Sequence, residues 1–587
     1  MASYWDNVLT KRIGRRRALA ATGGLAAGAA LLAACGGGDG DGDGGGPVSG
    51  LLYTPVDTSK SAKRGGVYKS RLPFGNPTSF DLHAFNNSIQ PFGNVIGSEL
   101  VKLKAFKGEN ATLEIEGDIA EDWEFSSDKL TLTFKLNPKA KWAPLSSSFH
   151  SGVPSSIAGR VVDADDVVFS WQRFEKTATA FGRLELANSY SKANPVLSVT
   201  KVDDKTVQMK LARPWSAVLP ALATWNVGYF YILPKEGRDN AIDFVKYAIG
   251  AGPYYIDKYE PSVGMTLKRN PYYEERDADF KLPYADTIDL PILVDPTAAL
   301  AQFRVGNIYN GGFTVGTLDD ILKLKSDIPD LLVRTAYTSD AGIMAFGQGK
   351  DSPWRDERMR QAISYAWNKD LMTQVVFTTD KLEAQGIPAN VRWSSALPSN
   401  TIEGFPNGTY EGYWLDPKDT KEFGENAKYY EYKPAEAKAL IKAVTGKDTF
   451  TFEHMAGFVF PSTNYGIDIF NGMVGDAGFN VTRKPMTAAD FTSLTTNLAP
   501  GETIARNWGN WVGLVTGIDS GGPDPGSYLH QHYHKDGGRF LGYSADGSGA
   551  TTAGDPFMND TIEKMMTEFD EKKRQDLAKE FSKYFAK

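Results

Sequence analysis

The chain has 587 residues, of which 41% are hydrophobic and 23% charged, and its formal net charge is -7. This mild acidity argues against a nucleic-acid-binding protein, which requires a basic surface. A chain of this length exceeds what one hydrophobic core can organise, so we expect at least two lobes.

The N-terminus has the composition of an export signal. Arg15, Arg16 and Arg17 precede a soft apolar run that ends in Leu32-Ala33-Ala34-Cys35. The run is shorter than the roughly 20 apolar residues of a bilayer-spanning helix. Its end resembles a bacterial lipobox, after which the cysteine is diacylated and becomes the new N-terminus. The paired arginines resemble a twin-arginine signal, although Sec export and an uncut anchor remain alternatives.

Cys35 is the only cysteine in the chain, so the folded part contains no disulfide and no thiol nucleophile. A lone cysteine at the end of a signal is best explained as a lipid attachment point. Residues 36–50, which consist mainly of glycine and aspartate, cannot pack into a core and predict a flexible tether. We therefore expect a signal peptide over 1–35, a linker over 36–50, and a body held near a membrane surface.

The first strong elements of the body are a strand and a helix. Residues 130–136 alternate apolar and polar side chains, which predicts a half-buried strand. Asp163 is a good N-cap for a helix that begins at Ala164, and acidic residues in its first turn suit the helix dipole. The apolar residues of this helix share one face.

Strands and helices then alternate to the end of the chain, which indicates an α/β fold. We expect a strand within 202–211, a hairpin over 250–270, a helix over 296–306 with Leu300 and Phe303 toward the core, and an amphipathic helix over 359–367.

Motifs that would mark an enzyme are absent. The sequence has no G-x-x-x-x-G-K-[ST], G-x-S-x-G, H-E-x-x-H or C-x-x-C. An exported hydrolase would need a carboxylate pair, a metal site or an activated serine, and none stands out. We predict no catalytic residue and no cofactor, with a hydrolase kept as the alternative of another class.

Three histidines stand close together at His530, His532 and His534. In a strand these alternate positions would share one face, and imidazoles on one face could hold a transition metal. A polar surface loop before Lys535 is the interpretation we favour, so no metal is assigned.

Several short segments occur in a fixed order along the chain: Ala120-Glu121-Asp122-Trp123-Glu124, Lys141-Trp142, Asp163-Ala164-Asp165-Asp166-Val167-Val168-Phe169-Ser170, Gly250-Ala251-Gly252-Pro253-Tyr254, Arg269-Asn270-Pro271-Tyr272-Tyr273, Asp295-Pro296, the helix around Met359, Pro434-Ala435-Glu436-Ala437 and Pro523-Asp524-Pro525. In this order they resemble the family 5 extracytoplasmic solute-binding proteins, the peptide- and nickel-binding group that feeds ABC importers.

This resemblance implies two α/β lobes, joined by hinge strands around a cleft that closes on the ligand. We place the first lobe, with an inserted subdomain, at 51–336 and the second at 337–587, with the crossing near 337–347. Compared with the family, the C-terminal return to the first lobe is expected to be short or missing. Trp123, Phe134, Trp171 and Tyr254 are expected in the core rather than in the cleft.

A free peptide is a zwitterion, so its burial requires partners for both termini, and a buried aspartate suits the α-ammonium group. In the peptide-binding members this acid follows a tryptophan and precedes a D-P or E-P pair. The matching candidate is Asp519, with Trp508 and Trp511 as possible walls of the cleft; a solvated loop acid and ordinary packing are the alternatives.

The resemblance further implies a peptide or oligopeptide ligand, with a metal chelate, an opine or a sugar as alternatives. The expected partners are the transmembrane subunits of an ABC permease and, through Cys35, the membrane. We expect a monomer in the periplasm or at the outer face of the cytoplasmic membrane.

Overall fold

The computed structural model describes residues 51–587 except 54–55, 85–91, 105–114, 178–185, 191, 193, 224–229, 274–275, 277–281, 311–317, 334–339, 348–350, 385–386, 388–391, 399–409, 411, 457–460, 486–511, 521–523, 538–539 and 541–553. The predicted signal, with Arg15 to Arg17 and Cys35, and the linker lie outside these residues. Of the helices described, none combines the length and apolar character that crossing a membrane requires.

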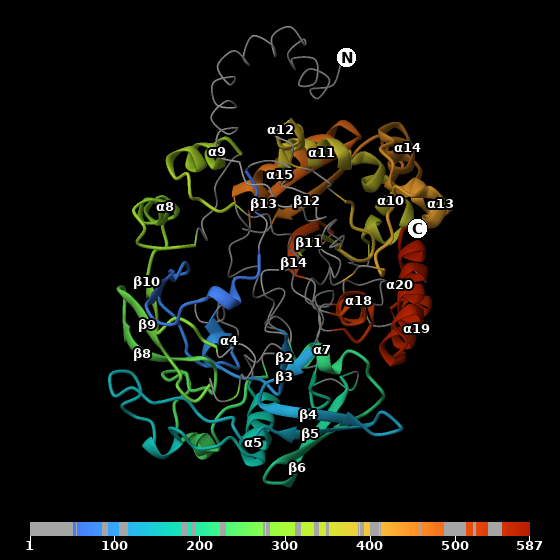
Figure 1. Ribbon diagram of the computed structural model, residues 1–587. Helices are drawn as coiled ribbons and strands as arrows, with labels where there is room; N and C mark the ends of the chain where they lie inside the picture. Colours follow the sequence, from blue (N-terminus) through green and yellow to red (C-terminus); the bar gives the residue numbers. More distant parts are fainter. Residues whose placement is uncertain are drawn as a thin grey trace, which may run out of the picture.

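The described strands form three four-stranded sheets and one two-stranded pair (Figure 1). The strands are β1 Val67–Lys69, β2 Val101–Leu103, β3 Ile115–Gly117, β4 Ala120–Phe125, β5 Thr131–Leu136, β6 Val196–Asp203, β7 Thr206–Leu211, β8 Tyr254–Glu260, β9 Gly264–Arg269, β10 Thr287–Pro291, β11 Asp340–Phe346, β12 Phe450–Ala456, β13 Phe479–Pro485 and β14 Leu514–Ser520.

The α-helices are α4 Gly93–Ile96, α5 Ala164–Phe174, α7 Val218–Leu222, α8 Pro296–Arg304, α9 Leu318–Asp327, α10 Glu357–Ala366, α11 Lys369–Phe377, α12 Thr379–Ala384, α13 Thr420–Phe423, α14 Pro434–Thr445, α15 Pro461–Asp476, α18 Pro525–Tyr533, α19 Pro556–Thr567 and α20 Glu571–Phe585. Short 3₁₀ turns cover Ser59–Ser61, Ser155–Ile157, Lys235–Asn240, Pro353–Arg355 and Glu425–Tyr430. The mixture of sheets and helices confirms the predicted α/β class.

The sheet β4-β5-β7-β6 is antiparallel throughout, and α5 lies against β6 and β7. Leu132, Phe134 and Leu136 of β5 are buried in alternation with more exposed residues, as a strand with one core face requires. The predicted strand over 130–136 is therefore confirmed. Trp171 is also buried, while Trp123 is only partly covered by the same core.

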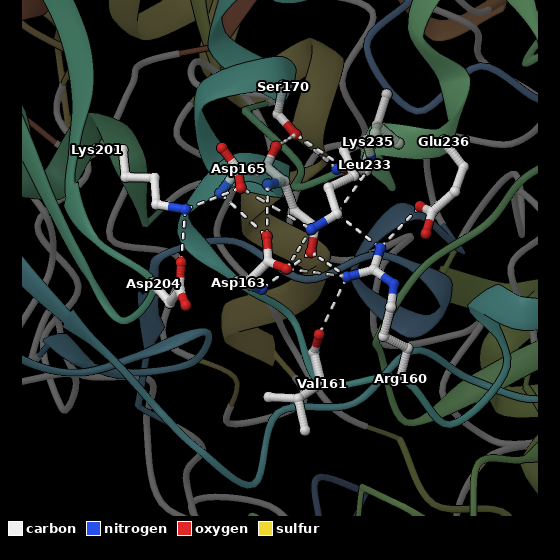
Figure 2. Close-up of polar contacts among 11 residues, drawn as sticks. Arg160, Val161, Asp163, Asp165, Ser170, Lys201, Asp204, Leu233, Lys235 and Glu236 are labelled. Atoms are coloured by element: carbon white, nitrogen blue, oxygen red, sulfur yellow. Dashed lines mark hydrogen bonds and ion pairs between the residues drawn. The ribbon is translucent and has the colours of Figure 1, made fainter.

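The first turn of α5 confirms the predicted cap. The Asp163 side chain accepts hydrogen bonds from the backbone of Asp165 and Asp166, and the Asp166 side chain accepts one from the backbone of Asp163. Arg160 donates two hydrogen bonds of 2.8 Å to the carboxylate of Asp166. Arg160 also donates to Glu236 at 2.7 Å (Figure 2). These contacts join the first turn of α5 to the 3₁₀ turn that contains Glu236, so the cluster fixes the start of α5 on the protein.

The second sheet, β1-β10-β9-β8, contains the predicted hairpin as β8 and β9. Tyr254 is buried in it, as expected. The predicted helix at 296–306 is present as α8, but its burial differs from the prediction. Ala299 is its buried residue, whereas Leu300 and Phe303 are only half-buried.

Buried side chains gather in two main clusters. The first core takes most of its residues from between Leu72 and Leu290. The second core lies around Trp354 and is built from α10, α14 and α15 against the sheet β11-β14-β12-β13. Met359, Ala362, Ile363 and Ala366 are buried there, which confirms the amphipathic helix predicted over 359–367.

The last helices return to the first core. Met558, Ile562, Met565 and Phe581 belong to it, although α19 and α20 follow the second sheet in sequence. Main-chain and side-chain contacts join α19 to the segment around Ser216. The backbone N–H of Ser216 donates to the carbonyl of Met566 at 2.9 Å, and the Ser216 hydroxyl donates to the same carbonyl. The predicted lobe limits, 51–336 and 337–587, stay a prediction, as does the short C-terminal return.

One buried histidine makes the first core sensitive to acid. His83 Nε2 donates to the carbonyl of Tyr231 at 2.7 Å, and Nδ1 accepts from Arg173 at 3.1 Å. Burial, followed by the charge of Arg173, lowers the pKa of His83 from 6.5 to about 4, although Asp81 opposes the change. The imidazole is therefore neutral in the folded protein.

We expect the protonation of His83 to lower the free energy of unfolding as the pH falls. Its pKa is lower in the folded state, so its contribution is fully present above pH 6.5 and is lost progressively toward pH 4. Between pH 7 and 5 this single group should remove about 2 kcal/mol of unfolding free energy. Urea unfolding at both pH values should show a smaller loss for His83→Gln than for the wild type; equal losses would contradict the assignment.

Candidate functional site

Two neighbouring strands, β11 and β14, carry the chain between the two cores. They pair antiparallel from Asp340 opposite Ser520 to Phe346 opposite Leu514. β11 leads into the second core and β14 leads out of it, after which α18 joins the first core. Between these strands, Leu397 and Tyr413 also pack in the first core. Both strands lie centrally between the upper and lower groups of elements in Figure 1. We refer to β11 and β14 as the crossing strands.

The carboxyl ends of parallel strands meet beside the crossing strands. β12 runs parallel to both β13 and β14, so the ends of these three strands lie at one edge of the sheet. In α/β sheets, ligands bind outside the carboxyl ends of the strands. This edge, where β14 also leaves the second core, is therefore the candidate functional site.

Asp519 lies in β14, near the carboxyl end of the strand and opposite Ala341 of β11. Its backbone thus belongs to a paired strand and not to the solvated loop that we considered as the alternative. Trp508 and Trp511 fall outside the described residues. The assignment of Asp519, Trp508 and Trp511 to ligand binding stays a prediction.

A second acid close in sequence, Asp524, has a structural role. Its side chain is 4% exposed, caps α18 through the backbone N–H of Ser527 at 2.8 Å, and forms an ion pair with Arg574 of α20. Burial acts against the charge on Arg574, but Asp524 and Tyr413 outweigh it and raise the pKa of the guanidinium. Asp524 therefore anchors the C-terminal helices beside the crossing strands.

The local structure predicted for the three histidines is wrong. They lie on helix α18 and its end, neither in a strand nor in a surface loop, and His532 and His534 are buried. The helical period places His530 and His534 on one face, where their rings stack at 4.6 Å, and turns His532 away. Asp524 at the N-cap and Pro525 at the first helical position were the signals of a helix.

The three histidines do not converge on a common point. His534 Nε2 lies 3.2 Å from a carboxylate oxygen of Glu563, whereas Nδ1 of His532 contacts the carbonyl of Tyr528 at 2.9 Å. Burial, with His534 and Arg213, lowers the pKa of His530 well below its usual value. Across the part of the chain that the structure describes, no group of three or more His, Cys, Asp or Glu side chains is arranged to hold a metal.

One polar cluster at the site escaped the sequence analysis. His454 of β12 is fully buried and contacts Asn471 of α15 at 2.6 Å and Thr516 of β14 at 2.9 Å. Burial lowers the pKa of His454, the Asn471 contact opposes this, and Arg483 adds to it. The detectable signal was a histidine at the third inward position of a strand that begins Phe450-Thr451-Phe452.

Comparison with known proteins agrees with this architecture. Residues 114–540 match the family described as bacterial extracellular solute-binding proteins, family 5 middle. The dipeptide-binding protein of Escherichia coli (strain K12) is 26% identical over 384 residues, which cover 63% of this chain and 61% of that protein. The match thus spans about three fifths of the relative's length.

Solved structures resemble the protein over nearly its whole length. The periplasmic binding protein DppA from Helicobacter pylori, in complex with the peptide STSA, has a TM-score of 0.62 at 19% identity, covering 90% of this chain and 91% of that one. NikZ from Campylobacter jejuni, in complex with Ni(L-His), has a TM-score of 0.60 at 17% identity, covering 89% and 90%.

At these identities the likeness shows the fold, which is that of the two-lobed periplasmic binding proteins. The family is one of binding proteins and not of enzymes. Because the family match extends from β3 through both crossing strands to the end of α18, the chain belongs to family 5 of the bacterial extracellular solute-binding proteins.

Proposed function

We propose that the protein is the substrate-binding component of an ABC importer and that its ligand is a peptide or oligopeptide. The observation that carries the proposal is the family match combined with the pair of crossing strands between two separate cores. Two bodies between which such strands run can close on a ligand by small changes in the strands. No bond is made or broken in this cycle.

Closure must be driven by differential affinity. A ligand shifts the population toward the closed form only by binding that form more tightly than the open one. A peptide meets this requirement because each lobe can supply partners that reach it only on closure. Asp519, at the end of the strand β14, would bind the α-ammonium group, and Trp508 and Trp511 would cover the peptide from the same segment.

The N-terminal features fit delivery at a membrane. Arg15, Arg16 and Arg17 would direct export, and a lipid on Cys35 would anchor the mature chain outside the cytoplasm. The 15 residues of the linker 36–50 would then allow a flexible reach of roughly 20 Å. A loaded monomer held at this distance can dock on the transmembrane subunits of the permease without leaving the surface.

A metal chelate is the second candidate ligand, since the fold is also that of NikZ in complex with Ni(L-His). Opines and sugars stay further alternatives. Calorimetry with a tripeptide and with Ni(L-His) distinguishes the two classes directly.

Asp519→Asn is expected to weaken binding of a free tripeptide at least 30-fold, because a charge-assisted contact with a buried ammonium group is worth about 2 kcal/mol or more. An N-acetylated tripeptide, which lacks the ammonium group, should bind both proteins weakly and equally in calorimetry. Asp448→Asn, on the exposed side of the second lobe, is the matched control and should bind like the wild type. Equal affinity of wild type and Asp519→Asn for the free peptide would refute the assignment of Asp519.

A further inference from the structure

His454 occupies a position at which the alternating pattern of the strand predicts an apolar side chain. In β12 the residues alternate between exposed and buried, and His454 follows Phe452 on the buried face. The ring of Phe470 packs edge-on against the imidazole at 5.6 Å. An imidazole in such a place costs free energy unless both of its nitrogens are hydrogen-bonded.

Both nitrogens of His454 have partners, and the partners come from different elements. The Oδ1 atom of Asn471, on α15, lies 2.6 Å from Nδ1. Since an amide oxygen can only accept, Nδ1 carries the proton and Nε2 accepts the hydroxyl of Thr516 at 2.9 Å. The imidazole thus links a helix of the second core to the crossing strand β14.

Thr516 is the last residue of β14 that pairs with β12 among the described residues. The ladder between β12 and β14 contains three residue pairs and ends with Ala456 opposite Thr516. Beyond it, within the described residues, Gly517 to Ser520 pair only with β11. Asp519 lies three residues past Thr516, in the part of the strand for which the described residues provide pairing with β11 alone.

We propose that His454 is a positioning residue that pins β14 to the second core at Thr516 and so fixes the pivot from which the end of the strand departs. The contact between His454 and Thr516 then determines the position of the segment that carries Asp519 when the lobes move. The part of this inference that concerns ligand rests on the proposed function; the part that concerns the strand does not.

The chemistry explains why a histidine suits this role better than an apolar residue. A leucine would fill the volume but would leave β14 free to slide against β12 where the ladder ends. The two directional hydrogen bonds fix the position of β14 along β12 and the rotation of β14 about its own axis. A buried network in which every polar group is hydrogen-bonded favours one arrangement. Arg483 of β13 lies opposite His454 in the ladder and forms an ion pair with Asp468 of α15.

The test measures amide hydrogen exchange of the full-length protein without ligand. Thr516→Val keeps the shape of the side chain but removes the hydroxyl, and exchange across 514–520 should rise about tenfold, which corresponds to about 1.4 kcal/mol. Thr516→Ser restores a hydroxyl and should return exchange close to the wild-type rate. Thr451→Val is the matched control, since its hydroxyl faces Asn480 on the other side of β12.

Unchanged exchange across 514–520 in Thr516→Val would overturn the proposal. An equal rise throughout α10, α14 and β13 would also overturn it, because that result describes general destabilisation. As a second variant, His454→Leu should raise exchange in the same segment, and a wild-type pattern would contradict the pin.

The part of the inference that concerns ligand binding is tested by calorimetry of the same variants with tri-alanine. Thr516→Val should bind it several-fold more weakly, and Thr516→Ser should bind it like the wild type. If the wild type itself fails to bind peptides, the proposed function fails, while the exchange data still decide whether His454 pins the strand.

Discussion

Asp524→Ala is expected to lower the free energy of unfolding by about 3–5 kcal/mol, the cost of leaving one charge of a buried pair without its partner. The Asp524 side chain is 4% exposed and that of Arg574 is 11% exposed. The same substitution removes the cap of α18, in which Asp524 accepts from the backbone of Ser527. Among the described residues, Arg574 would keep two long contacts, one of 3.3 Å with the carbonyl of Met565 and one of 3.4 Å with the hydroxyl of Tyr413.

Urea unfolding followed by circular dichroism measures this loss, and hydrogen exchange locates it in α18, α19 and α20. The double variant Asp524→Asn with Arg574→Met removes both charges and should recover much of the stability. Asp448→Ala, an exposed acid paired with Lys442, is the control and should change stability little. A cost below about 1 kcal/mol for Asp524→Ala would show that the pair does not hold the helices.

Trp354→Ala is expected to cost about 3–5 kcal/mol, the usual range for removing a fully buried aromatic side chain. Trp354 is completely buried, and Phe346, Phe450, Phe452 and Phe479 surround its ring at 5.1 to 5.9 Å. Its indole N–H also donates to the carbonyl of Val512 at 2.8 Å, just before β14. The loss therefore combines a cavity with an unpaired carbonyl group.

This loss should be confined to the second core, because the buried neighbours of Trp354 belong to it. Hydrogen exchange should accelerate in α10, α14 and β12 and should stay unchanged in β5 and β7. Tyr432→Ala, at a side chain that is 45% exposed, serves as the aromatic control. Equal acceleration in β5 and β7 would contradict the separation of the two cores.

Local features of the fold could be predicted from the sequence because their causes are local. The alternation of Leu132, Phe134 and Leu136 follows from the pleat of one strand, and the cap at Asp163 needs only its own first turn. The hairpin of β8 and β9 likewise forms between neighbouring segments. Each of these predictions depends on residues within about one element of each other.

The return of the C-terminal helices to the first core could not be predicted in this way. The contact between Arg213 and Glu563 joins residues 350 positions apart, and no periodicity within α19 indicates its partner. The histidine prediction failed for a different reason. It followed the alternate spacing of His530, His532 and His534 and neglected the Asp-Pro start of a helix five residues earlier.

The site was predicted only in part. Asp519 was chosen from its place before Asp524-Pro525, and the structure puts its backbone in a crossing strand, while its role in binding stays a prediction. His454 was overlooked because one polar residue in a strand gives no motif. Its significance becomes visible only when Asn471 and Thr516, which are distant in sequence, are brought to its two nitrogens.

Mass spectrometry of the small molecules released by denaturing the full-length protein, purified from its native host, tests the central claim most directly. The account predicts one peptide-like compound in stoichiometric amount, recovered with unchanged mass after prolonged incubation with the protein. Fragments or other products that accumulate during this incubation would contradict it, as would the release of no small molecule at all.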